Sequence, residues 1–127
     1  MSTFALKNID AVVGKQTFDK LIVDGVSLLD EFEDNVEDIY KSEIPGLYAS
    51  MNQIANLKSL PQTKFHPYSD GTDGCREFEF KSKHLRIYAI EKPGGKIVVL
   101  GGTKANQDKD QSKFRKIKEQ YLASLKE

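Results

Sequence analysis

The chain has 127 residues, with 19 basic and 19 acidic side chains and a formal net charge of zero. This length suits one domain with a real hydrophobic core and is too short for two, so we expect a single domain over residues 1–127. Cys75 is the only cysteine, which excludes an intrachain disulfide and any metal site built from thiolates. No apolar run is long enough to cross a bilayer and no secretion signal is present, so we expect a cytoplasmic protein without a membrane partner.

The charges are unevenly distributed along the chain. Residues 1–60 hold 5 basic and 10 acidic side chains, whereas residues 61–127 hold 14 basic and 9 acidic. Between residues 81 and 118 there are 11 basic residues and 3 acidic ones. Such a basic segment either binds a polyanion through its phosphates or forms a solvated face balanced by the acidic half.

The N-terminal quarter predicts an arm and then a strand. Residues 1–15 show no clear period, and we expect a loose arm there. Residues 16–23 alternate apolar and polar side chains and end at Asp24-Gly25, which is a turn signal. A first strand is therefore predicted over residues 16–23.

Two helices are predicted next. Ser27 with Asp30 three residues later is a capping signature, and apolar residues recur at helical spacing as far as Tyr40, with acidic residues on the outer face. Ser42 can cap a second helix that carries Pro45 in its first turn. Because few residues join the helices, we expect an antiparallel two-helix hairpin packed on one face of a sheet.

The second half predicts a meander. Residues 64–68 form a short strand, placed at an edge because Pro67 cannot donate to a ladder, and residues 69–74 form a flexible turn. Strands over 75–81, 84–91 and 96–101 are joined by connections short enough for hairpins. The fold class is therefore α+β: a twisted antiparallel sheet, a meander of about four to five strands, with an N-terminal two-helix hairpin and a C-terminal helix over 109–126.

Arg86 is the most informative single residue. It lies on a strand beside the nearly all-apolar segment 97–100. An arginine in such surroundings is costly unless it has an anionic partner. A phosphate is one such partner, which makes RNA a candidate ligand. We therefore expect the Arg86 guanidinium to face an open concavity that can receive the sugar-phosphate chain.

The order of strand, two helices and antiparallel strands, together with three short motifs, resembles the RelE/ParE toxin superfamily, closest to its HigB-like branch. The motifs are Phe78-Glu79-Phe80-Lys81, Leu85-Arg86-Ile87-Tyr88 and Gly101-Gly102-Thr103-Lys104, after Leu-Pro-x-x-Lys-Phe at residues 60–65. The resemblance covers roughly Thr17 to Leu122 and is sharpest from Lys64 to Lys104. It implies the toxin of a type II toxin-antitoxin system, with a cognate antitoxin, usually of helix-turn-helix type, and ribosome-bound mRNA as partners. It implies no small-molecule cofactor and no metal.

The resemblance also implies a chemistry, in which a 2′-hydroxyl attacks the adjacent phosphorus without a metal. This reaction needs a base, an acid and a cation for the developing charge. Arg86 falls on the family's phosphate-binding arginine, and Lys104 falls near its second basic position. The candidate RNA-binding residues are Lys64, Arg76, Lys81, Lys83 and Tyr88; Tyr88 either stacks on a base or packs in the core.

The acid and the base are less clearly marked. His84 lies two residues before Arg86, where strand alternation puts both on one face, and either a catalytic role or an exposed turn histidine fits it. Glu79 is a candidate base or an ion-pair partner of Arg86, and His66 is more simply structural. Glu77 and Glu79 stand where some family members carry paired lysines. Residues 105–109 hold no match to a late catalytic tyrosine.

Three functions therefore remain in view. The leading one is a HigB/RelE-like mRNA endoribonuclease, an mRNA interferase. The second is a ParE-like toxin that inhibits DNA gyrase by protein contact and needs no acid or base. The third is a noncatalytic relative that only binds RNA or an antitoxin.

Overall fold

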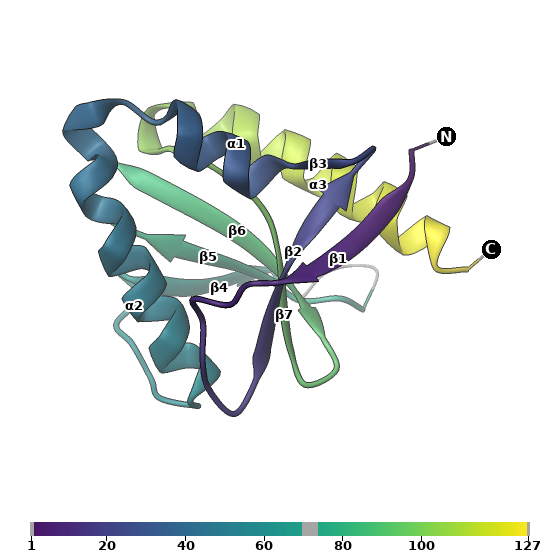
Figure 1. Ribbon diagram of the computed structural model, residues 1–127, viewed down its shortest axis with the longest axis horizontal. Coiled ribbons are helices and arrows are strands. Elements are labelled where there is room, and N and C mark those ends of the chain that lie inside the picture. The colour runs from purple at the N-terminus through teal and green to yellow at the C-terminus, as the bar shows by residue number, and fades with distance from the viewer. Residues whose placement is uncertain (1, 70–73, 127) are drawn as a thin grey trace.

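The computed structural model describes residues 2–69 and 74–126, and the predicted turn at 69–74 therefore lies largely outside the described residues. These residues form an α+β fold in which one sheet carries helices on both faces (Figure 1). The strands are β1 (Phe4–Asn8), β2 (Thr17–Val23), β3 (Val26–Ser27), β4 (Phe65–Ser69), β5 (Glu77–Lys81), β6 (Leu85–Lys92) and β7 (Gly95–Thr103). The helices are α1 (Leu28–Asn35), α2 (Ile44–Ala55) and α3 (Gln107–Ser124), with 3₁₀ turns η1 (Asp38–Glu43) and η2 (Lys104–Asn106).

The sheet is mixed rather than antiparallel. Its strand order is β1-β2-β7-β6-β5-β4, with β3 paired to the end of β2. The meander β4 to β7 is antiparallel and β4 lies at the edge, as predicted. β2 pairs in parallel with β7, from Thr17 opposite Gly95 to Lys20 opposite Val98. The predicted four to five antiparallel strands are therefore wrong in count and in one pairing, because parallel pairing between distant segments leaves no local turn signal.

The loose arm predicted over residues 1–15 is also wrong in part. Residues 4–8 form β1, which pairs antiparallel with β2 from Phe4 opposite Val23. The ring of Phe4 packs edge to face on Tyr121, with 5.7 Å between ring centroids. Most of β1 is exposed, including Leu6, so the strand shows none of the apolar alternation that reveals a half-buried strand.

The first helix begins as predicted, but the helical hairpin does not form. The Ser27 hydroxyl accepts a hydrogen bond from the amide of Asp30 at 3.1 Å and so caps α1. α1 ends at Asn35, and Val36 is extended and buried. η1 then redirects the chain, so that α2 runs across α1 rather than back along it (Figure 1). Ser42 lies inside η1 and caps nothing, whereas Pro45 does occupy the first turn of α2.

The two faces of the sheet carry separate apolar clusters. α1 and α2 pack on the face that presents Leu85, Ile87 and Ala89, whereas α3 packs on the face that presents Tyr88 and Ile90. No helix within residues 2–69 and 74–126 is both long and apolar enough to span a bilayer.

Helices approach the end of β7 from both sides. A methyl carbon on Gly101 would lie 2.5 Å from the Phe32 ring of α1, and one on Gly102 would lie 1.9 Å from Oδ2 of Asp110 on α3. The sequence suggests a close approach at this strand end as the reason for the Gly-Gly pair, and the structure shows that the groups that approach are the Phe32 ring and the Asp110 carboxylate.

Candidate functional site

Among the described residues, the turn between β5 and β6 holds a cluster of polar side chains that are hydrogen-bonded to one another and to the turn. The turn residues are Ser82 and Lys83, followed by His84. The Ser82 amide donates to the Leu85 carbonyl at 3.0 Å, and the Leu85 amide donates to the Ser82 hydroxyl at 3.2 Å. These two bonds fix the turn that presents Lys83 and His84.

Glu43, at the end of η1, reaches across to this turn. One carboxylate oxygen, Oε1, accepts hydrogen bonds from the Ser82 hydroxyl and, at 2.9 Å, from the His84 amide. The other, Oε2, lies 2.7 Å from Nδ1 of the His84 ring. Partial burial disfavours the charge, but these hydrogen bonds outweigh it and hold the pKa of the Glu43 carboxyl below its ordinary value. Glu43 is thus an ionised acceptor at neutral pH.

The contact with Glu43 settles how the His84 ring is used. Because an ionised carboxylate only accepts, Nδ1 carries the hydrogen, and in the neutral ring Nε2 keeps its lone pair. No residue that the structure describes bonds to Nε2. The side chain is 41% exposed, and Tyr40 stacks on the ring with 4.5 Å between centroids. This is the arrangement of a histidine whose outer nitrogen can accept or deliver a proton to a ligand.

Lysines surround this turn. Lys83 is exposed beside His84, and the Lys104 amide donates to the His84 carbonyl at 2.8 Å, which fixes η2 against the turn. Lys41 follows Tyr40 but pairs with Asp38 at 3.3 Å. A pocket of about 480 Å³ lined by residues 104–109 adjoins the same end of the sheet. The predicted candidates His84, Lys83 and Lys104 are therefore brought together.

Arg86 does not take the position that the sequence suggested. We expected its guanidinium to face an open concavity, yet the residue is only 7% exposed. Its Nη1 donates to the carbonyls of Ser82 at 2.7 Å and Leu85 at 2.8 Å, while the buried Nε has no hydrogen-bond partner among the residues that the structure describes. Arg86 lines none of the four pockets described for this chain. The expectation of an exposed guanidinium is wrong, because the side chain folds back onto its own turn.

His84 and Arg86 do not share a face either. His84 precedes the first residue of β6, so strand alternation does not govern it, and Glu43 draws its ring toward η1. Arg86 lies on the other side, opposite Gly102, where α3 covers the sheet. The expectation of a shared face is therefore wrong.

The two glutamates on β5 face α3. Glu77 is 4% exposed and pairs with Lys118 at 2.9 Å. Glu79 is 3% exposed. One of its carboxylate oxygens lies 3.8 Å from Lys81 Nζ and the other accepts a hydrogen bond from the Gln111 side chain at 3.4 Å, so its partners are these two residues rather than Arg86. A carboxylate buried in this way is a structural ion-pair partner, which argues against Glu79 as the base.

Tyr88 belongs to the core. Its side chain is fully buried and stacks on Phe114 of α3 with 5.5 Å between centroids. Burial, helped by the nearby charges of Glu79 and Asp110, raises the pKa of its hydroxyl above the ordinary value. Of the two roles that the sequence left open, the structure supports core packing and not base stacking.

The remaining RNA-binding candidates are not part of the turn. Lys81 is half-buried near Glu79 on β5, and Lys64 is exposed just before β4, where its carbonyl accepts the Lys81 amide at 2.8 Å. Arg76 lies at the far end of β5, with its guanidinium over the Phe78 ring at 5.3 Å. These residues do not form one surface with His84.

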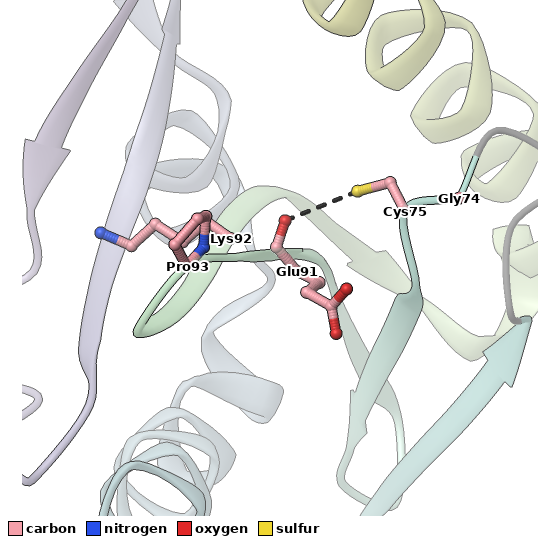
Figure 2. Close-up of a pocket in the computed structure, with 5 residues that line it drawn as sticks. All are labelled: Gly74, Cys75, Glu91, Lys92 and Pro93. Carbon is pink, nitrogen blue, oxygen red and sulfur yellow. Dashed lines mark hydrogen bonds between the residues drawn. The ribbon is translucent and has the colours of Figure 1, made fainter.

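A small pocket at that far end holds the lone cysteine. Figure 2 shows Gly74, Cys75, Glu91, Lys92 and Pro93 around it, with the Cys75 thiol 3.5 Å from the Glu91 carbonyl. The Lys92 side chain points away from the thiol, toward β2, where it pairs with Asp19 at 2.6 Å.

Sequence reasoning missed Glu43 as a member of the site. The residue lies 41 positions before His84 and follows an acidic helical face, so it was indistinguishable from solvated carboxylates. Among residues 2–69 and 74–126 no group of three potential metal ligands forms. In comparisons with known proteins, no family model, no curated protein and no solved structure matches this chain.

Proposed function

We propose that this chain is an RNA endoribonuclease that cleaves by 2′-hydroxyl attack, with His84 as its proton-transfer residue. The observation that carries the proposal is the His84 ring, fixed through Nδ1 by Glu43, with Nε2 left open on a lysine-rich turn. The RNA and toxin context comes from the resemblance to RelE/ParE toxins. The choice of His84 and Glu43 as the reacting pair comes from the geometry of the turn.

The reaction begins with proton removal. His84 Nε2 takes the proton of a 2′-hydroxyl, whose oxygen then forms a bond to the adjacent phosphorus. The bond from phosphorus to the 5′-oxygen breaks, and that oxygen receives a proton from the imidazolium. The products are a 2′,3′-cyclic phosphate and a 5′-hydroxyl. The Glu43 carboxylate stabilises the imidazolium formed midway, as a carboxylate beside a catalytic histidine does.

The lysines serve the phosphate. Lys83, next to His84 in the turn, and Lys104, whose amide donates to the His84 carbonyl, are exposed and supply positive charge to the phosphorane as it forms. Arg86 acts one step away. Its two hydrogen bonds to the carbonyls of Ser82 and Leu85 hold the turn, so we assign it as a positioning residue.

The biological setting follows the resemblance: toxin of a type II toxin-antitoxin system, acting on ribosome-bound mRNA and held inactive by a cognate antitoxin. One observation favours a second candidate. Arg86 and Glu79, which fall at family site positions, are only 7% and 3% exposed, as suits a relative that binds RNA or an antitoxin without cleaving. The two functions differ in one measurable property, which is cleavage.

The test is a single-turnover assay on a 5′-labelled RNA with excess EDTA. We expect cleavage that leaves a 2′,3′-cyclic phosphate, and His84→Gln to slow it by about 10²–10⁴-fold, the usual contribution of a general acid or base. His66→Gln is the matched control and should cleave at the parent rate. Equal rates for His84→Gln and parent would contradict the assignment of His84. RNA binding with no cleavage by the parent chain would support the noncatalytic candidate.

A further inference from the structure

A pocket of about 420 Å³ lies at the other end of β6 from His84. It is formed by the chain just after α2, by β4 and β5, and by the start of β7, and its lining includes Leu57, Lys58, Phe65, Arg76, Phe78 and Lys96. In the β6–β7 ladder the backbone of Lys96 lies opposite Glu91, near the C-terminal end of β6, whereas His84 precedes the first residue of β6. At about 3.3 Å per residue the two places are roughly 20 Å apart. The pocket is therefore separate from the site described above.

Lys96 is a buried cation in this pocket. The residue is 9% exposed, and its Nζ lies over the Phe78 ring at 4.4 Å and over the Phe18 and Phe65 rings at 5.8 Å each. Within residues 2–69 and 74–126, Nζ makes no hydrogen bond and no ion pair. Contacts with ring faces return only part of the cost of taking an ammonium group out of water. A buried charge of this kind is normally paired, and this one points into a pocket where a ligand can pair it.

A second cation shares the same ring. The Arg76 guanidinium lies over Phe78 at 5.3 Å. Burial, and then the charge of Arg76, hold the pKa of Lys96 below its ordinary value. Lys58 is exposed at the rim, and Glu91 is the one acidic residue among those described in the lining. Two cations that lie over the same ring favour an anionic ligand that can contact both.

One part of the pocket wall is aromatic. Phe65 and Phe78 stack nearly parallel, with 5.6 Å between centroids and 14° between planes. Leu57 is 64% exposed at the mouth, beside exposed Pro67. A volume within 300–1,000 Å³ and apolar surfaces beside placed polar groups are usual for small-molecule sites.

We propose that this pocket binds a phosphate monoester attached to a planar ring, such as a nucleoside monophosphate. The phosphate lies between Lys96 and Arg76, and the ring lies against Phe65 and Leu57. The ligand is either a free nucleotide or the 5′-phosphorylated end of an RNA, since both present the same group. The inference does not rest on the proposed nuclease activity.

The test is titration of the full chain, followed by amide chemical shifts in NMR. Adenosine 5′-monophosphate should shift the resonances of Lys96, Phe78 and Gly95, and adenosine without phosphate should not. Inorganic phosphate should bind more weakly than the nucleotide, because it lacks the ring. Lys96→Met should weaken nucleotide binding by about tenfold or more, equivalent to loss of one charged contact. Lys116→Met, an exposed lysine on α3, should bind as the parent does.

Two further arms separate the sources of the ligand. A 5′-phosphorylated tetranucleotide that binds more tightly than its 5′-hydroxyl counterpart supports an RNA end, and a preference for the mononucleotide supports a free nucleotide. The proposal is overturned if the nucleotide leaves the spectrum unchanged. It is also overturned if Lys96→Met and the parent bind equally, or if inorganic phosphate binds as tightly as the nucleotide.

Discussion

The buried ion pair between β5 and α3 gives the sharpest prediction about stability. Lys118 Nζ lies 2.9 Å from Oε2 of Glu77 and donates to the Cys75 carbonyl at 2.6 Å. The two side chains are only 2% and 6% exposed. Lys118→Met keeps the length of the side chain but leaves the Glu77 carboxylate buried without its closest cation. The expected effect is a large loss of stability.

The magnitude follows from what remains around Glu77. Removing one partner of a buried pair typically costs about 3–5 kcal/mol, because the other charge stays buried. Arg115 still lies 3.7 Å from Oε1 of Glu77, but its side chain is 54% exposed and offers partial compensation. We therefore expect a loss near the lower limit, about 3 kcal/mol, or a fall in Tm of roughly 10 °C for a domain of this size. This is a sizeable fraction of the ~5–15 kcal/mol that stabilises a typical domain.

The assay is urea unfolding followed by far-ultraviolet circular dichroism, since the chain has no tryptophan for fluorescence. The double variant Glu77→Leu/Lys118→Met removes both charges and should return to within about 1 kcal/mol of the parent. Lys116→Met, an exposed lysine on the same helix, should change stability by less than about 0.5 kcal/mol. A single variant Lys118→Met as stable as Lys116→Met would refute the reasoning, as would a double variant less stable than the single one.

Three other predictions follow from the same structure. Gly95→Ala places a methyl carbon 1.7 Å from the Thr17 carbonyl oxygen, so it should disturb the β2–β7 pairing and cost about 1–3 kcal/mol of stability. Gly46→Ala in α2 meets nothing within 4 Å and should stabilise the fold by roughly 0.5 kcal/mol; urea midpoints unchanged by both variants would contradict these expectations. Because folding lowers the pKa of Glu43, its carboxylate stabilises the fold fully above the pKa that it has in the unfolded chain, and this stabilisation is lost as pH falls through its pKa in the folded chain. The difference in unfolding free energy between the parent and Glu43→Gln should therefore become smaller in acid, and a difference independent of pH would contradict this. Because folding lowers the pKa of Lys96, its positive charge destabilises the fold at neutral pH, and less so as pH rises past its pKa in the folded chain. At pH 7 Lys96→Met should have a Tm at or above that of the parent, and a large fall in Tm would show that the contacts of the ammonium group within the chain already stabilise it.

Local signals predicted most of the elements. The Ser27 cap, the strand over residues 17–23 and the short turns of the meander were visible because each depends on residues a few positions apart. The parallel pairing of β2 with β7 was not visible, because it joins segments some eighty residues apart through α1 and α2. The end of α1 at Asn35 was missed because the apolar spacing continues beyond it, through Val36 and then Tyr40 of η1, which both still reach the core.

The candidate site was predicted only in part, because contacts between residues distant in the sequence orient its side chains. Alternation placed His84 beside Arg86, but a residue in a turn is oriented by its contacts, and Glu43 draws the ring to the other side. The burial of Arg86 depends on α3 and on two carbonyls of its own turn, neither of which has a sequence signature. An Arg86→Ala variant would therefore test the turn as much as any phosphate contact. His84, whose outer nitrogen is exposed, is the better residue to change.

The proposed function depends on His84 transferring the protons during RNA cleavage. The most direct measurement is sequencing of transcript 5′ ends in bacteria after induction of the parent chain, with His84→Gln and His66→Gln expressed to the same level. We expect new 5′-hydroxyl ends with the parent and with His66→Gln, and none with His84→Gln. Growth arrest with unchanged transcript ends, or the same new ends from His84→Gln, would contradict it.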